Sequence, residues 1–452
     1  KRFKPDDHKQ MNAICSLAGG MNAMKCSQIW IVGVVLLLIA TPARGAGTYL
    51  SSGGPISQSM GGASTAAPLD PIGALHWNPA TASGLNRELG VGFGLLQPLT
   101  ETRSSIAGLG GGASESESGV AILPSIGWIH RADDSPVTFG LGVMSVAGFS
   151  NNFEASATNP FFLPQSNTPG VPGGFGRVYT RADFLQIAPI VSVSLSESFS
   201  VAAGPTLTLG QLFIDPLVTT APNDADGSGA PRYSSGRASR VHFGGGFQLG
   251  AYYITDTCWH FGASLKSPQW MEEFRYFTED ELGLPAIGRA KLDLPMILSL
   301  GTAYSGLPGY TLAMDVRYYD YKNTDGFGPH GFNADGSING LGMSSVMQLA
   351  FGVQYEVSDD LQLRAGYTYN QNPFQDAEAT FSVAATLIYQ HQLAAGFTKK
   401  LTENVSANFA YTYYPENSLT GPIVTPTGAI PGSSVTTELQ VHHLNFGVGI
   451  RY

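Results

Sequence analysis

The chain has 452 residues, of which 43% are hydrophobic and 13% are charged, and its formal net charge is −10. Charged residues are about half as frequent as in an average globular domain, and the acidic balance excludes nucleic acid as an expected partner. No run of about 18 apolar residues follows the N-terminal region, which leaves two classes, a large soluble β-protein and a membrane β-barrel.

Residues 1–45 carry the features of an export signal. Lys25 precedes the apolar run 29–40, and Ala43 and Gly45 offer small side chains for cleavage. Such a short run is typical of a secretory signal peptide, here preceded by upstream residues. The alternative is an N-terminal membrane anchor.

Residues 46–87 form a second region that is rich in Gly, Ala and Pro. Its stretch 70–85, DPIGALHWNPATASGL, lacks the alternation of a strand, and its composition predicts a compact segment of turns without a helix. Pro79 fixes its own φ and pushes Asn78 out of the α region, while the Asn78 side chain can bond the neighbouring backbone. Asn78, Pro79 and Ala80 are therefore candidates for pinning this segment, and a plain structural turn is the alternative.

Residues 88–452 consist largely of segments in which apolar and polar residues alternate, roughly fourteen of them. In 310–321, for example, Leu312 and Met314 share one face while Asp315 and Arg317 share the other. This pattern fits a half-buried sheet in a soluble protein or in a membrane, so it does not by itself place the chain in lipid.

The connections between these segments distinguish the two classes, because short and long links alternate. The short links are 132–136, 196–198, 255–257, 306–309, 358–360 and 402–404, and the expected long ones are 154–181, 217–241, 275–287, 325–343, 375–386 and 419–441. Short turns at one end and long loops at the other are typical of outer-membrane barrels. The sequence therefore predicts an all-β fold, an antiparallel transmembrane barrel of about 14 strands with both termini on the periplasmic side.

The last strand ends on an aromatic residue, Tyr452, after alternating apolar residues. This ending resembles the signal that the barrel-assembly machinery reads, which makes that machinery and outer-membrane lipid expected partners. A barrel of this size encloses more space than its own side chains fill. Residues 46–87, folded inside the barrel of residues 88–452, would act as a hatch that plugs it.

Four stretches resemble the FadL/TodX-type outer-membrane transporters of long-chain fatty acids and hydrocarbons. They are MGGASTAAPLDPIGALHWNPA (60–80), KLDLPMILSLGTAYS (291–305), LAMDVRYYDYKN (312–323) and LRAGYTYNQNPFQD (363–376). The resemblance implies an N-terminal hatch that ends in Asn-Pro-Ala and a lateral route through a kinked strand. Gly148 is a candidate for that break, since Gly within a strand often marks a bulge.

Charged residues on the strands are expected to point into the lumen, because on the lipid face they would cost a few kcal/mol. These are Asp315, Arg317, Glu356, Arg364 and Arg451. Two interpretations stay open: a salt-bridge lattice that braces wall and plug, or Arg317 or Arg364 meeting an acidic head group of the ligand.

Apolar residues in the long loops are candidates for docking a hydrophobic ligand. Phe161, Phe162 and Leu163 form one group, and Trp270, Met271, Phe274 and Phe277 form another with helical spacing. The alternative is that the loops pack on one another over the barrel mouth.

Together these features predict a monomeric bacterial outer-membrane barrel that passively transports hydrophobic small molecules, without a cofactor. A general diffusion porin and a barrel enzyme are the alternatives. No H-E-x-x-H or G-x-S-x-G motif is present, so no catalytic or metal residues are expected. The loop run 224–229, DADGSG, has calcium-loop spacing but lacks the final Glu, and a polar turn is the preferred interpretation.

Overall fold

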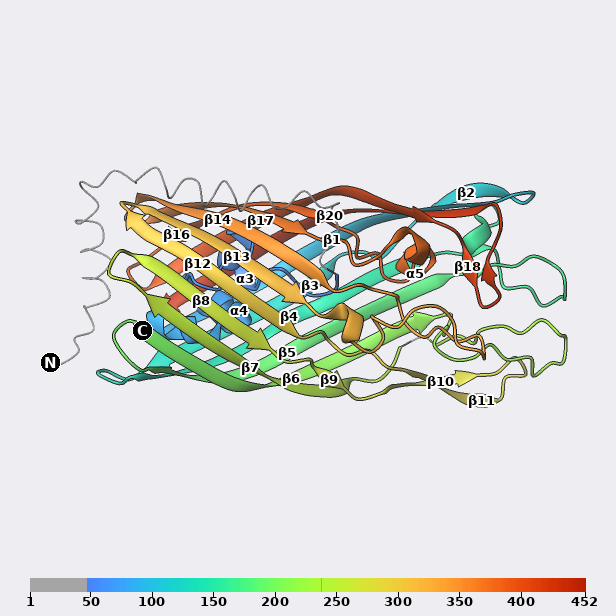
Figure 1. The fold of residues 1–452 in the computed structure, drawn as a ribbon, viewed down its shortest axis with the longest axis horizontal. Helices are drawn as coiled ribbons and strands as arrows, with labels where there is room; N and C mark the ends of the chain where they lie inside the picture. Colours follow the sequence, from blue (N-terminus) through green and yellow to red (C-terminus); the bar gives the residue numbers. More distant parts are fainter. Residues whose placement is uncertain (1–46, 237) are drawn as a thin grey trace.

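The computed structural model describes residues 47–236 and 238–452, so the expected signal peptide lies outside the described residues. In this part of the chain, strands hydrogen-bond in an antiparallel ring that closes where the first strand pairs with both the last one and the third (Figure 1). The main sheet has 16 strands; β2 and β9 are short additions, and the other 14 form the ring. The predicted 14-stranded barrel is confirmed.

The ring strands are β1 (Glu88–Ile106), β3 (Ala121–Arg131), β4 (Val137–Phe153), β5 (Val178–Ser194), β6 (Phe199–Asp215), β7 (His242–Ile254), β8 (Trp259–Lys266), β12 (Ile297–Leu307), β13 (Tyr310–Tyr319), β14 (Val346–Ser358), β15 (Leu361–Asn370), β16 (His391–Lys400), β17 (Val405–Gly421) and β20 (Ser433–Arg451). Outside the ring lie β2 (Gly110–Glu115), β9 (Trp270–Met271), β10 (Phe274–Glu279), β11 (Pro285–Ala290), β18 (Val424–Thr425) and β19 (Gly428–Ala429).

The six predicted short turns all join neighbouring strands at one end of the barrel, where the C-terminus also lies (Figure 1). Long connections lie at the opposite end. Two of the expected loops are largely strand: 275–287 contains most of the β10–β11 hairpin, and 419–441 is mainly the extension of β17 and β20 beyond the wall. The composition of these stretches is typical of loops, and the prediction was therefore wrong there. Each stretch forms strand because it pairs with an antiparallel neighbour, which supplies its backbone hydrogen bonds.

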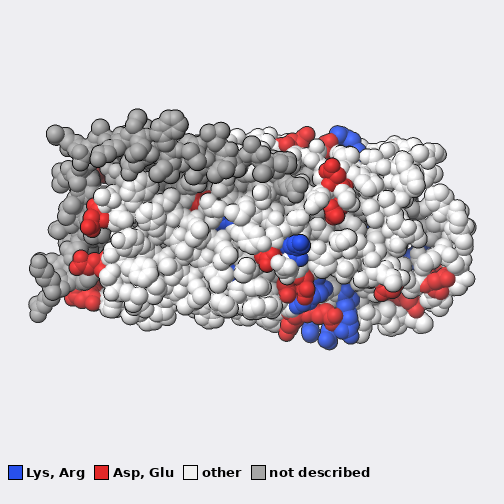
Figure 2. All heavy atoms as spheres, viewed as in Figure 1, with Lys and Arg blue, Asp and Glu red and all other residues white. Residues whose placement is uncertain are grey.

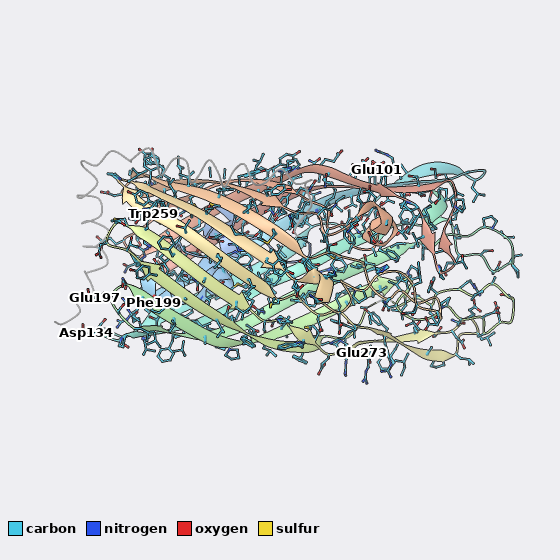
Figure 3. The ribbon with its side chains drawn as sticks, viewed as in Figure 1. Glu101, Asp134, Glu197, Phe199, Trp259 and Glu273 are labelled. Atoms are coloured by element: carbon cyan, nitrogen blue, oxygen red, sulfur yellow. The ribbon has the colours of Figure 1, made fainter. Side chains whose placement is uncertain are left out.

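The outer surface has an apolar band. Alternate wall residues are exposed and apolar, among them Phe93, Leu141, Phe243, Phe247, Phe261, Leu300, Leu312, Phe397, Phe446 and Val448. On the face shown in Figure 2, the half toward the short turns carries few charged side chains except acidic ones at its end. Figure 3 places Asp134 and Glu197 at that end and Glu101 and Glu273 beyond the opposite edge of the band. An uncharged band of this kind is the part of a barrel that faces lipid.

Residues 47–87, here called the inner segment, lie inside the ring and are almost entirely buried. They include α3 (Gly54–Ser59), α4 (Pro71–Trp77) and the 3-10 helix η1 (Pro79–Gly84). The prediction of turns without a helix is therefore wrong. Asp70 accepts hydrogen bonds from the amides of Ile72 and Gly73, and Pro71 occupies the first helical turn, so an effective N-terminal cap offsets the poor composition.

The remaining helices are short and lie in the connections: η2 (Pro160–Phe162), η3 (Tyr321–Asn323), η4 (Asp376–Glu378) and α5 (Ala379–Ser382). Within the described ranges, no helix is long and apolar enough to cross a membrane.

Glycines line the inner wall where the inner segment approaches it. A Cβ atom on Gly366 would overlap the backbone of Gly61, and one on Gly262 would overlap the carbonyl of Thr65. Gly is the residue that permits such close backbone approach. Part of the high Gly content thus serves the packing of segment against wall.

Tyr452 lies at the closure of the barrel. Its amide donates a hydrogen bond to the Arg87 carbonyl (3.2 Å), and its ring stacks beside His130. We expect deletion of Tyr452, or Tyr452→Asp, to lower the amount of heat-modifiable barrel in the outer membrane, because this aromatic residue ends the predicted assembly signal and makes contacts with Arg87 and His130. The check is a comparison of folded protein by electrophoresis without boiling, with Tyr452→Phe as the control. Unchanged levels in the deletion variant would contradict the assembly role.

Candidate functional site

A buried ion pair joins the barrel wall to the inner segment. Asp315 on β13 accepts hydrogen bonds from the amides of Ser64 and Thr65 (both 2.9 Å) and pairs with Arg317 on the same strand. Both side chains are fully buried. The predicted inward orientation of these two residues matches their burial.

The Arg317 guanidinium is occupied by protein groups. It donates to the Gly62 carbonyl (2.6 Å) and to Gln348 on β14 (2.9 Å), and it stacks on the Trp77 ring at 3.7 Å. These contacts favour the first of the two interpretations left open, the bracing of wall and plug. A ligand head group would have to displace them.

A second buried cation, Lys266 at the end of β8, was missed by the sequence analysis. Its ammonium group donates to the Tyr49 hydroxyl (3.0 Å). The Tyr49 backbone amide in turn donates to the Tyr321 hydroxyl (3.1 Å), so both the backbone and the side chain of Tyr49 hold the start of the inner segment. Lys266 and Ser264 are two residues apart on one strand and therefore point to the same, inner side of the wall. This alternation could have identified Lys266 as a buried cation.

Asn78 joins α4 and η1 to each other and to the wall. Its side-chain oxygen accepts from the Ala80 amide (3.1 Å), and its amide group donates to the carbonyls of Thr65 (2.8 Å) and Ala251 on β7 (3.0 Å). Pro79 begins η1, and Ala80 packs with Ala202 and Tyr252. The Asn-Pro-Ala stretch therefore connects two parts of the inner segment with one wall strand.

A large cavity of about 1,260 Å³ opens at the end of the barrel that carries the short turns, next to the inner segment. Arg364 lines it and donates to Gln354 (2.7 Å), Thr398 and Gln362 (both 2.8 Å). Glu356 and Arg451 also line it, but both are exposed at the mouth, where their strands end. They lie at the rim rather than deep in the lumen. The alternation of a strand predicts the side of the wall to which a side chain points, but not how far along the barrel axis it lies.

Arg451 pairs with Glu88 (2.6 Å) across the β1–β20 seam, which closes the barrel between its first and last strands. This pair supports a structural role for Arg451.

The wall is interrupted between β3 and β4. Pairing of the two strands stops at Ser125 and Met144, and β4 then bulges at Val146. Beyond the bulge the inner segment replaces β3 as the neighbour: the Leu50 amide donates to the Val146 carbonyl (2.8 Å), and the Gly148 amide donates to Thr48 (3.2 Å).

Gly148 was the expected break, but the bulge lies two residues earlier. Gly148 itself lies in the paired part of β4, where a Cβ atom would approach the Ala182 carbonyl to 2.8 Å. It is therefore required for a close approach to β5 rather than for the bulge.

A small cavity of about 80 Å³ lies beside this interruption, between the inner segment and the wall. Among the described residues, those that line it carry no formal charge; they are Gly47, Thr48, Leu50, Ser51, Leu96, Pro98, Thr100, Gly148, Phe149, Ser150, Asn151, Thr386, Leu387, Tyr389, Tyr414, Leu439 and Val441. Its environment suits an apolar, uncharged group.

The apolar loop residues do not form one exposed docking surface. Phe161 and Phe162 are buried and pack against other aromatic rings, and Leu163 is partly buried. The helical stripe expected over 270–277 is wrong, because this stretch is strand: Met271 and Phe274 are buried, while Trp270 and Phe277 point outward. Side chains on a strand point alternately to its two sides, whereas the expected helix would have placed all four on one face. Two of the four residues therefore lie in the core and two on the outer surface.

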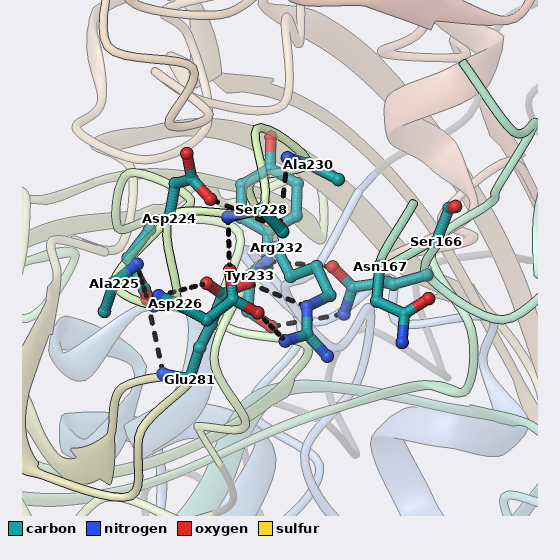
Figure 4. Close-up of polar contacts among 12 residues, drawn as sticks. Ser166, Asn167, Asp224, Ala225, Asp226, Ser228, Ala230, Arg232, Tyr233 and Glu281 are labelled. Atoms are coloured by element: carbon teal, nitrogen blue, oxygen red, sulfur yellow. Dashed lines mark hydrogen bonds and ion pairs between the residues drawn. The ribbon is translucent and has the colours of Figure 1, made fainter. Parts of the chain in front are cut away.

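The loop with calcium-like spacing is closed by an arginine. Asp224, Asp226 and Glu281 come together, and Arg232 bonds Asp226 (3.2 Å) and Glu281 (2.7 Å) (Figure 4). The Ser228 backbone amide also bonds Asp226 and lowers the pKa of its carboxyl group. Arg232 supplies positive charge where a cation would bind, which supports the interpretation as a polar turn.

A hydrogen-bonded Ser–His–Tyr chain escaped the sequence analysis. His260 contacts Ser305 (2.9 Å) and Tyr252 (2.6 Å) from two neighbouring strands. In serine hydrolases a carboxylate takes the third place and stabilises the charged imidazole. A neutral tyrosine does not supply that charge, so the arrangement does not favour the enzyme alternative.

Known proteins share this architecture. The family model described as outer membrane protein transport protein (OMPP1/FadL/TodX) matches residues 36–452. The chain belongs to this family. OMPP1/FadL/TodX proteins are outer-membrane transporters of hydrophobic compounds, and the predicted family, outer-membrane location and transporter class are confirmed.

Solved structures of the OMPP1/FadL/TodX type share the fold. A FadL homologue from Pseudomonas aeruginosa has a TM-score of 0.64, and the toluene transporter TodX from P. putida has 0.62; each is 16% identical, with 89% of this chain and 99% of that chain covered. The toluene transporter TbuX from Ralstonia pickettii has a TM-score of 0.59 at the same identity and coverage. No curated protein matches the sequence.

Proposed function

We propose that this transporter moves uncharged hydrophobic compounds passively, through the 80 Å³ cavity between the inner segment and the wall. The observation that carries the proposal is the position of this cavity: it is apolar, and it adjoins the stretch of β4 that β3 leaves unpaired. A hydrophobic ligand that reaches the cavity lies one backbone layer from the lipid. Exit sideways into the bilayer then requires no passage through water.

The inner segment acts as the hatch in this proposal. Its first residues, Thr48 to Leu50, occupy the place beside β4 that a wall strand would otherwise take. Displacing them breaks the hydrogen bonds of Thr48, Tyr49 and Leu50 described above and the contact between the Leu50 carbonyl and His76 (3.3 Å), while the ion pair of Asp315 and Arg317 holds the rest of the segment in place. A cavity that binds benzene has about 150 Å³, so a ring-sized ligand requires a small shift of these residues.

A diffusion porin for polar solutes is less well supported, because the inner segment fills the lumen at the level of the apolar band. Fatty acids and hydrocarbons both remain within the proposed class, which is defined by the uncharged lining. The carboxyl group of a fatty acid would enter this cavity protonated.

Filling the cavity tests the proposal. Leu439→Trp places a larger side chain into the lining, and we expect the initial uptake rate of radiolabelled toluene, octane and oleate to fall on the order of tenfold, because the indole ring occupies the space that the ligand needs and displacing it costs about 1.4 kcal/mol or more. Uptake is measured in cells that lack other transporters of this kind. The matched control is Leu363→Trp, at an exposed position of the outer wall. Equal uptake by parent and Leu439→Trp protein, at equal levels of folded barrel, would refute the route.

A further inference from the structure

The β10–β11 hairpin extends the barrel wall outward and carries two arginines side by side. Arg275 and Arg289 are directly opposite each other in the antiparallel register, and both are more than half exposed. Like charges at such positions repel, because their Cβ atoms lie about 5 Å apart. An anion placed between the two guanidinium groups would offset this repulsion.

The protein supplies only part of that negative charge. Glu273 is the one carboxylate that both arginines share, at 2.6 Å from Arg289 and 4.0 Å from Arg275. Arg240 is exposed nearby, two residues before His242, whose ring accepts the Arg275 amide hydrogen bond (3.3 Å), and Arg240 makes no ion pair with any described residue. The three arginines therefore outnumber the two carboxylates at this edge, Glu272 and Glu273, although the chain as a whole is acidic.

The position of the arginines in the membrane indicates the kind of anion. β9 pairs with β7, so the exposed Trp270 lies opposite Gly245, two residues along β7 from the exposed Phe243. The arginines follow Trp270 along the chain, just beyond this edge of the apolar band. Figure 2 shows charged side chains gathering at this edge, and Figure 3 places Glu273 there. Tryptophan is typical of the membrane interface, and the layer beyond it contains the lipid head groups.

We propose that the outer face of the β10–β11 hairpin, with Arg240, binds the phosphate groups of a phosphorylated glycolipid in the outer leaflet. Arginine forms paired hydrogen bonds with phosphate oxygens, and two arginines in register present a wider donor surface than either alone. Acyl chains of the same molecule lie along Phe243 and Trp270. Phe277, which is 88% exposed, and Ile287 stand opposite each other just beyond the arginines and offer an apolar surface to the C–H faces of the sugar rings.

The test uses the full chain in nanodiscs with fluorescent diphosphorylated lipid A as the probe. We expect Arg275→Gln to weaken binding about fivefold, and Arg275→Gln with Arg289→Gln roughly 25-fold. The control is Arg103→Gln, an equally exposed arginine of the outer surface that lies between Glu101 and Glu438. Heat-modifiable migration verifies the fold of each variant.

Three results would overturn the proposal. The first is equal lipid A affinity in the parent and the double variant, or an equal loss in Arg103→Gln. The second is undiminished binding of dephosphorylated lipid A, which would mean that apolar or sugar contacts suffice. The third is loss of binding on adding EDTA, which would assign the contact to divalent cations on Glu272 and Glu273 rather than to the arginines.

Discussion

Removal of the inner segment, Gly47 to Arg87, is expected to convert a closed barrel into an open pore. The wall strands bond to one another around the whole ring, so the sheet does not depend on the segment for closure. The space left by α3, α4 and η1 would fill with water. Conductance in planar bilayers should rise to that of an open porin, and uptake of toluene should fall, because the cavity loses one of its two sides.

Asn78→Ala combined with Pro79→Ala is the milder form of the same experiment. It removes the bonds from Asn78 to Thr65 and Ala251, and we expect a partial rise in conductance. A deletion variant that folds but conducts no better than the parent would contradict the role of residues 47–87 as a plug.

Loss of the buried arginine should produce the largest single-residue effect. Arg317→Met leaves the Asp315 carboxylate buried without its ion-pair partner, and breaking one half of such a pair typically costs about 3–5 kcal/mol. Because both residues bond the inner segment, the loss should also loosen the segment. The expected result is a lower midpoint of denaturant unfolding and intermittent conductance.

The chain contains a matched control for this experiment. Arg181 and Asp183 form an ion pair at 2.7 Å with the same two-residue spacing on β5, but both are nearly half exposed. Arg181→Met should change stability by less than about 1 kcal/mol. Equal losses from Arg181→Met and Arg317→Met would show that burial against the inner segment is not what makes the Asp315 pair important.

Much of the wall could be predicted from sequence because a barrel strand repeats a simple rule. Alternation placed Leu312 outward and Asp315 and Arg317 inward, and the short turns gave the order of the strands. These features depend on neighbours in the chain. Depth along the barrel depends on where strands begin and end, which is why Glu356 lies at the rim instead of inside.

The candidate site was harder to predict, because its contacts join residues far apart in the chain. The pairing of Thr48 to Leu50 with β4 has no local signature, and the bulge falls at Val146, a residue that favours strands, rather than at Gly148. In 270–277, apolar residues at helical spacing form strand because the chain continues the edge of β7. Tertiary pairing overrode the local pattern.

The glycines of the inner wall have a consequence for how such proteins diverge. Gly366 touches Gly61, and Gly262 touches Thr65, so no side chain can be added at these wall positions unless the inner segment recedes. Mutations on the inner wall and on the inner segment are therefore expected to be accepted only in combination. A chimera that receives the inner segment of a distant relative should assemble well only when the strands bearing these glycines are exchanged with it.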